Sequence, residues 1–179
     1  MANHVRNILK MKGIASLPLF SEEGPLVFDF NKLIPMPEPL SPKAGSMKGI
    51  GAAAWYDWRI ENWGTNCNGY DIDVINEDWL AFLTAWLPPE KVIAALAQRY
   101  PQTEIEHWWA DENFGSRSGY AKYSQGKDEK TEHFAAGSDG AYNTFDFCWG
   151  GPCLYRDKNG GWQRKDCSQC NGCDDGRLL

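Results

Sequence analysis

The sequence lacks the features of several large functional classes. It has no run of about 20 apolar residues that could span a membrane, and its first residues lack the apolar segment and cleavage site of a signal peptide. Its 18 basic residues are outnumbered by 24 acidic ones, and the net charge of -6 provides no general positive field for nucleic acid. The P-loop, the glycine-rich dinucleotide motif, the zinc-protease helix motif and the hydrolase nucleophile elbow are absent. We expect a cytoplasmic protein that does not bind membranes and for which nucleic acid is a disfavoured partner.

Material for a packed core is plentiful. Of the 179 residues, 42% are hydrophobic, and nine are tryptophans, which excludes a disordered chain. The length suits one domain with a small appendage. We expect a core domain over residues 1–125 and a C-terminal extension over residues 126–179.

Hydrophobic periodicity predicts the elements of the core domain. Sequence patterns predict strands over 4–12, 70–75, 104–110 and 119–123, and helical spacing predicts helices over 48–63 and 88–100, with loops over 13–47. The apolar run 79–86 could be helical by periodicity alone, but its length and the prolines after it favour a strand. The order is strand, helix, strand, strand, helix, strand, with one more strand added. This order is typical of a ferredoxin-like α+β fold, a split βαβ arrangement with both helices on one face of an antiparallel sheet.

The extension carries a different pattern. Residues 124–140 are polar and contain glycines, which predicts a loop connection. Residues 143–149 alternate again and predict a strand that leads into the cysteine-rich region. The Asn159-Gly160 pair then predicts a hairpin turn.

Five of the six cysteines lie in the last 32 residues, and their spacing is C-x4-C, a gap, and C-x2-C-x2-C. They are Cys148, Cys153, Cys167, Cys170 and Cys173. In a reducing cytosol, such a cluster favours a metal over disulfides. Zinc in a closed four-thiolate structural site is the leading interpretation, with either Cys148 or Cys173 left over. An iron–sulfur cluster and free thiols are the alternatives.

Three tryptophans are candidates for a binding surface. They are Trp63, Trp108 and Trp109. Because Trp108 and Trp109 are neighbours in a predicted strand, one of them should face away from the core. An exposed tryptophan on an open sheet face is typical of a protein-binding hot spot.

A second hypothesis is an enzyme whose site lies where residues Asn62–Asp71 meet Asp111–Asn113. Asp111 and Glu112 are adjacent carboxylates, although neighbours in a strand point to opposite faces and more often form a solvated hairpin tip. Among the three histidines, His107 falls in a predicted strand, where a histidine is usually a hydrogen-bonded sheet residue. A third hypothesis, a nucleic-acid-binding zinc module in the tail, has thin electrostatic support, because residues 148–179 carry five basic and four acidic residues.

Several stretches match motifs of a known family in the same order along the chain. They are Phe30–Glu38 (FNKLIPMPE), Arg59–Thr65 followed by Asn68–Asp71 (RIENWGT, NGYD), Thr84–Pro89 (TAWLPP), and Trp109–Glu112 with Gly119. In these stretches the chain resembles the YubB-like or Api-like proteins carried on enterobacterial plasmids, prophages and genomic islands. Cys67 and Gly69 depart from the family pattern, which has tryptophan and alanine there.

This resemblance implies a ferredoxin-like fold and an origin on a mobile genetic element, and it implies no activity. Our leading hypothesis from the sequence is therefore a non-enzymatic accessory protein that binds another protein through its sheet face or tryptophan-rich surface.

Overall fold

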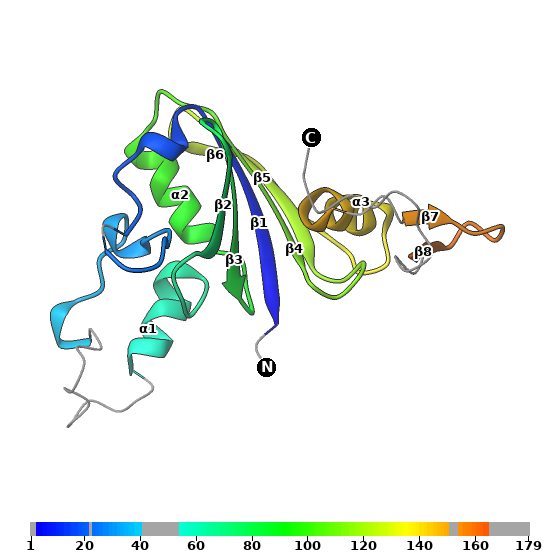
Figure 1. Cartoon of the computed structure of the whole chain (residues 1–179), viewed down its shortest axis with the longest axis horizontal. Helices are drawn as coiled ribbons and strands as arrows, with labels where there is room; N and C mark the ends of the chain where they lie inside the picture. The colour runs from blue at the N-terminus through cyan, green and yellow to red at the C-terminus, as the bar shows by residue number, and fades with distance from the viewer. Residues whose placement is uncertain (1–2, 22, 41–53, 151–153, 165–179) are drawn as a thin grey trace.

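A computed structural model gives the fold, and the residues that it describes are 3–21, 23–40, 54–150 and 154–164. Six strands form one antiparallel sheet in the order β2-β3-β1-β4-β5-β6 (Figure 1). The strands are β1 (His4–Met11), β2 (Tyr70–Asn76), β3 (Trp79–Ala85), β4 (Ile105–Asp111), β5 (Ser118–Ser124) and β6 (Lys127–Phe134). The helices are α1 (Ala54–Trp63), α2 (Glu90–Arg99) and α3 (Asp139–Trp149).

The first four strands and two helices form the predicted split βαβ arrangement. Strand β1 lies at the centre and pairs antiparallel with both β3 and β4. Its alternation sends Val5, Leu9 and Met11 into the core, as the pattern predicted. The two β-α-β units therefore interlock around β1, as the ferredoxin-like order requires.

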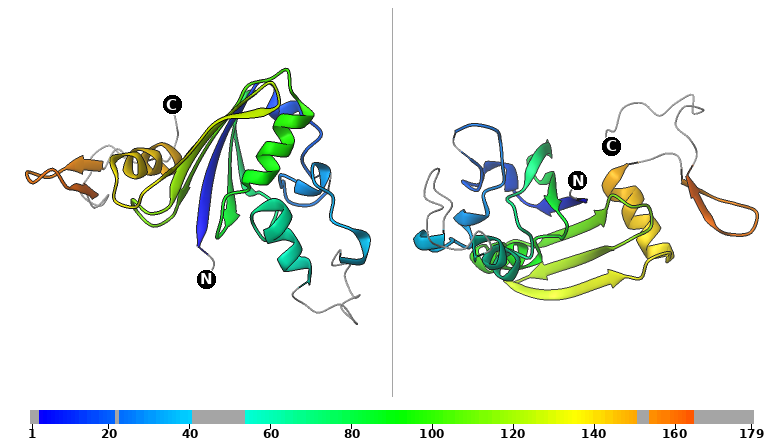
Figure 2. Two further views of the ribbon diagram at one scale, coloured as in Figure 1. Left: turned by 180° about the vertical axis from the view of Figure 1, so that it is seen from behind. Right: turned by 90° about the horizontal axis from the view of Figure 1, so that it is seen from below.

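One face of the sheet is covered by α1, α2 and the described part of the segment that links β1 to α1, residues 12–21 and 23–40 (Figures 1 and 2). That segment contains three short 3-10 turns, Ile14–Ser16, Phe30–Lys32 and Glu38–Leu40. The main core lies between these layers. Helix α2 contributes Val92, Ile93, Leu96 and Ala97, the apolar stripe expected from helical spacing.

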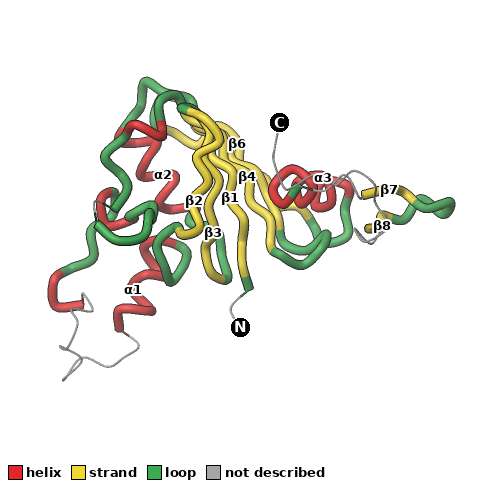
Figure 3. The backbone as a smooth tube through the Cα atoms, in the orientation of Figure 1, coloured by secondary structure: helices red, strands yellow, loops and turns green. Residues whose placement is uncertain are grey.

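The opposite face of the sheet carries α3, which corrects two expectations (Figure 3). Residues 143–149 form part of this helix and not a strand, and the helices do not all lie on one face. Ser138 caps the helix by accepting a hydrogen bond from the Ala141 N–H, at 3.2 Å. Ala141, Phe145 and Cys148 are buried at helical spacing, and this period outweighs the alternation of aromatic residues.

Residues 124–140 also differ from the expected loop. Strand β6 occupies Lys127–Phe134 and pairs with β5 as an edge strand. Nearly all of its side chains are exposed on both faces, so it has no apolar alternation for a sequence pattern to detect. Strand β6 therefore extends the main sheet by one strand beyond residue 125.

A short hairpin follows α3, formed by β7 (Leu154–Arg156) and β8 (Trp162–Arg164). Its turn contains Asn159 and Gly160, and the Asp157 carboxylate accepts hydrogen bonds from the Asn159 and Gly161 N–H groups. Cys153, Cys167, Cys170 and Cys173 lie outside the described residues, so the cysteine-rich part of this region stays a prediction. Within the described ranges, every helix is too short or too polar to cross a bilayer.

Candidate functional site

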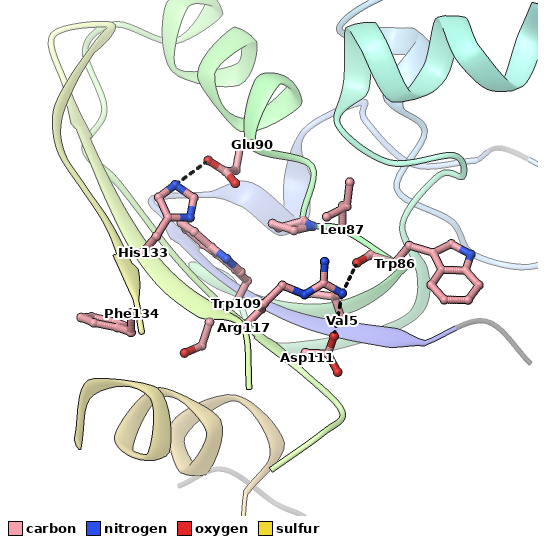
Figure 4. A pocket seen from close by; sticks show the side chains of 11 residues that line it. Val5, Trp86, Leu87, Glu90, Trp109, Asp111, Arg117, His133 and Phe134 are labelled. Carbon is pink, nitrogen blue, oxygen red and sulfur yellow. Dashed lines mark hydrogen bonds and ion pairs between the residues drawn. The ribbon is translucent and has the colours of Figure 1, made fainter. Parts of the chain in front are cut away.

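A cavity of about 210 Å³ opens at the end of the sheet where α2 begins (Figure 4). Its walls come from the helix-covered face of the central strands, from β6, and from the connection between β3 and α2. The lining residues are Val5, Trp86, Leu87, Pro88, Glu90, Trp109, Asp111, Arg117, Ser118, His133 and Phe134. Most of these side chains are aromatic or aliphatic, and four of them are ionisable.

The backbone of Trp86 lies at the rim of this cavity in a strained conformation, and its indole points away from the cavity (Figure 4). Its φ is 70°, and the Leu87 N–H donates to the Ala85 carbonyl at 2.8 Å. A hydrogen bond spanning two residues with a positive φ between them marks the rare, strained form of the γ-turn. The residue is 42% exposed although tryptophan has the largest apolar side chain. Strain of this kind is maintained by surrounding structure and concentrates at functional sites.

A chain of buried hydrogen bonds maintains the turn. The Thr84 hydroxyl donates to the Leu87 carbonyl at 2.9 Å and accepts from the Asn7 side-chain amide at 3.0 Å. The Asn7 amide oxygen lies 3.0 Å from Nε2 of His107. All three side chains are fully buried. The network therefore links the centre of β4, through β1 and β3, to the loop that presents Trp86.

The direction of this network fixes the tautomer of His107. Because the Asn7 amide nitrogen donates to Thr84 and to the Val5 carbonyl, its oxygen accepts, and Nε2 of His107 must carry the proton. Nδ1 is buried and lacks a partner among the described residues. Burial lowers the pKa of His107 to about 3, so the ring is neutral at physiological pH. The expectation of a hydrogen-bonded sheet histidine is confirmed.

An ion pair between Asp111 and Arg117 stands on one side of the cavity. Nη2 of Arg117 donates to Oδ2 of Asp111 at 3.1 Å and to the Trp86 carbonyl at 3.4 Å. The other oxygen of Asp111 accepts from the backbone and side-chain N–H groups of Asn113, at 2.9 and 2.7 Å. Asp111 is buried, and both of its carboxylate oxygens accept hydrogen bonds. The carboxylate therefore fixes the guanidinium against the rim.

A second pair, Glu90 and His133, stands on the opposite side. Nε2 of His133 on β6 lies 3.4 Å from the Glu90 carboxylate at the start of α2. Partial burial raises the pKa of Glu90, His133 opposes the rise, and Asp128 adds to it. The Glu90 carboxylate is therefore partly desolvated, and His133 does not balance its negative charge when that ring is neutral.

Trp109 forms the floor and depends on a glycine in the next strand. Trp109 pairs with Gly119, and Gly119 pairs with His133. The indole lies over Gly119 so closely that an added Cβ would stand 2.2 Å from Cζ2 of the ring. The Trp109 and His133 ring centroids are 5.4 Å apart. The glycine that follows the Trp109–Glu112 motif is thus the position that lets the ring lie flat on the sheet.

The expected tryptophan surface is only partly exposed. Trp63 and Trp109 are 0% and 2% exposed, so neither can anchor a partner without rearrangement. Trp63 is enclosed by core aromatic rings and donates from its indole to the Ile34 carbonyl at 2.9 Å. Trp108 faces the other way and is half-buried, stacked on Trp79 and packed against Phe147 of α3. The helix that the sequence analysis missed covers the surface on which Trp108 was expected to stand open.

The two segments of the enzyme hypothesis approach each other without sharing this cavity. His4 links them, because its ring lies 2.6 Å from the Tyr70 hydroxyl and its carbonyl accepts from the Glu112 N–H. Residues Asn62–Asp71 contribute nothing to the cavity lining. Cys67, the thiol in that segment, accepts from the Ala85 N–H at 3.3 Å, and burial raises its pKa, which disfavours a nucleophilic thiolate.

Cys148 lies in the core between α3 and the sheet. It is fully buried among Ile8, Ala81, Ala110 and Phe145. Burial raises the pKa of its thiol, and Arg6 opposes the rise only in part. A metal ligand must be a thiolate, so this environment disfavours Cys148 as a ligand.

Sequence reasoning missed Trp86 as a functional candidate, because it placed this residue at the end of a buried strand. The available signal was the position of Trp86 just before Leu87-Pro88-Pro89. Prolines restrict the preceding backbone and prevent strand pairing, so a large apolar residue there is a candidate for exposure.

Comparison with known proteins supports the fold. Residues 62–148 match the family model for the ferredoxin-like domain in Api92-like protein. Among solved structures, the chain is similar to protein api92 from Yersinia pseudotuberculosis, with 25% identity and a TM-score of 0.39, over 50% of this chain and 33% of that chain. The chain thus spans a third of that relative. No curated protein matches. The family match confirms the predicted ferredoxin-like fold and the resemblance to Api-like proteins.

Proposed function

We propose that this protein is a non-enzymatic binding module that engages a partner protein at the cavity beside Trp86. The observation that carries the proposal is an exposed tryptophan in a strained turn, whose backbone borders the cavity while the indole points outward beside it (Figure 4). Tryptophan is the residue most enriched at binding hot spots, which form where a rigid anchor meets a pocket. The turn is held by the buried network from Thr84 to His107, and strain of this kind concentrates at functional sites, which supports a role for the residue that it presents.

The size of the cavity favours a protein partner over a free metabolite. Its volume of about 210 Å³ is below the roughly 300–1,000 Å³ that small-molecule sites occupy. One side chain fits such a space, while Trp86 outside it can pack against the adjoining backbone. The partner would therefore insert a single residue and cover the rim.

Replacement of Trp86 by alanine should remove binding without unfolding the protein. Peptides selected on the wild-type protein from a random displayed library should bind the W86A variant about 30-fold more weakly, the loss expected at a hot spot of about 2 kcal/mol. The free energy of unfolding should change by less than about 1 kcal/mol, because Trp86 is a partly exposed residue that belongs to neither of the two buried core clusters. Fluorescence titration and urea unfolding measure the two quantities.

Leu26 provides the matched control, since its side chain is 48% exposed and lies outside the cavity. The L26A variant should bind the selected peptides like the wild type. Equal affinity of the peptides for wild type and W86A, or equal losses in W86A and L26A, would contradict the proposal.

For the tail, we propose a structural zinc ion held by Cys153, Cys167, Cys170 and Cys173. Their spacing in the sequence supports four thiolate ligands, and the burial of Cys148 supports leaving that residue out. The zinc would stabilise the region after the β7–β8 hairpin and perform no chemistry.

Elemental analysis of the full-length protein tests this set. Wild type and the C148A variant should both carry about one zinc per chain, and C170S should carry almost none. Loss of zinc in C148A with retention in C173S would instead identify Cys148 as the fourth ligand. Iron and a visible chromophore would point to an iron–sulfur cluster.

The resemblance to Api-like proteins supports a wider setting for these proposals. The protein would act in the cytoplasm as an accessory product of a mobile genetic element. Its partner would be another protein, in keeping with the acidic net charge of -6 that disfavours nucleic acid.

A further inference from the structure

The charges around the cavity do not balance. Two carboxylates line it, Asp111 and Glu90, but only one permanent cation, Arg117. The fourth ionisable group is His133, which is charged only when protonated. With His133 neutral, the cavity has a formal charge of -1, and the whole chain has the same sign.

The unmatched charge belongs to Glu90. Asp111 uses both of its oxygens, one with Arg117 and one with Asn113, so the cation nearest to it is already committed. Glu90 contacts His133 at 3.4 Å, a long distance for a hydrogen bond. Its side chain is 36% exposed, and desolvation raises its pKa. A second cation beside Glu90 would supply the positive charge that Arg117, already paired with Asp111, does not.

The walls between the rim and Glu90 suit an apolar chain. Leu87, Pro88 and Val5 line the cavity together with the indole of Trp109 (Figure 4). Aromatic rings attract cations through their faces, and a lysine buries its methylene stem along apolar walls while its ammonium group finds a carboxylate. A guanidinium is planar and wider, so the small volume favours the compact ammonium.

We infer that the cavity accepts a primary ammonium group on an unbranched apolar stem, as a lysine side chain of the partner protein presents it, and that Glu90 is its counter-ion. The inference rests on the proposed function, because the same cavity receives the partner's inserted residue. Trp86 would pack against the partner backbone on either side of that lysine.

Titration with n-butylammonium, followed by the nuclear magnetic resonance signals of the Trp86 indole and the Leu87 and His133 amides, tests the inference. Butylammonium should produce saturable shifts in the millimolar range, and n-butyrate, of equal chain length, should produce none. The E90Q variant should bind butylammonium about tenfold more weakly or worse, since it keeps the shape of the side chain and loses the charge. The control E104Q removes an exposed carboxylate outside the cavity and should bind like the wild type.

Absence of saturation with butylammonium, equal binding by E90Q, or binding of butyrate would each overturn the ammonium inference. The failure of the wider proposal is distinguishable from these results. Selected peptides that depend on Trp86 but lack a basic residue would overturn the inference and leave the binding module standing. Peptides that do not depend on Trp86 would overturn the binding module itself.

Discussion

Lowering the pH from 7 to 4 should cost the wild-type protein about 3 kcal/mol of unfolding free energy through His107 alone. Its pKa is about 3 in the folded protein against 6.5 for the ordinary side chain. The unfolded chain therefore binds a proton first, and the stability is complete above pH 6.5 and is lost as the pH falls toward 3. Protonation of the folded state would put a second N–H, on Nδ1, into a site with no acceptor among the described residues.

Comparison with the H107Q variant isolates this contribution. Glutamine can still donate to the Asn7 oxygen but does not titrate, so the difference in stability between the two proteins should shrink by about 3 kcal/mol from pH 7 to pH 4. Carboxylates contribute equally to both proteins and cancel in the difference. Parallel stability curves for wild type and H107Q would refute the assignment of a neutral buried His107.

Replacement of Gly119 by alanine should destabilise the protein by about 2–3 kcal/mol, a typical cost of overpacking. The new methyl would stand 2.2 Å from Cζ2 of Trp109 and 2.5 Å from the Glu132 carbonyl oxygen. Either the indole leaves the sheet or β6 separates from β5, and both movements alter the wall that carries His133. Binding of selected peptides should fall together with stability.

Urea unfolding measured by tryptophan fluorescence gives the size of this effect. G161A is the control, because its added methyl would meet only the side-chain carboxylate of Asp157, at 3.2 Å, in an exposed turn. It should unfold within about 0.5 kcal/mol of the wild type. A G119A protein as stable as G161A would show that the Trp109 ring does not need the glycine.

The sequence predicted the elements whose hydrophobic period matches their burial. Strand β1 and helix α2 each bury one face, so alternation and helical spacing located them. Strand β6 was not predicted, because an edge strand with two solvated faces has no hydrophobic period. Its formation depends on backbone pairing with β5. Helix α3 was predicted as a strand, because its aromatic residues Phe145, Phe147 and Trp149 alternate as the residues of a strand do. Ser138 was a helix-capping signal in the sequence.

The candidate site was predictable only in fragments. Residues Asp111–Asn113 and Trp109 were singled out from the sequence, but their assembly with Glu90 and His133 depends on β6 and on the register of β4, β5 and β6. The role of Trp86 depends on a backbone turn, which Thr84 fixes through a network reaching His107. Contacts between residues 84 and 107 cannot be inferred from local periodicity, since they arise from the strand order of the completed sheet.

Mapping the contact surface of a selected peptide by nuclear magnetic resonance tests the central claim most directly. The largest chemical-shift changes should fall on the Trp86 indole and on the backbone amides of Leu87, Arg117 and His133, around the cavity. Changes confined to α3, to the β7–β8 hairpin or to the outer edge of β2 would contradict it and place the binding surface elsewhere.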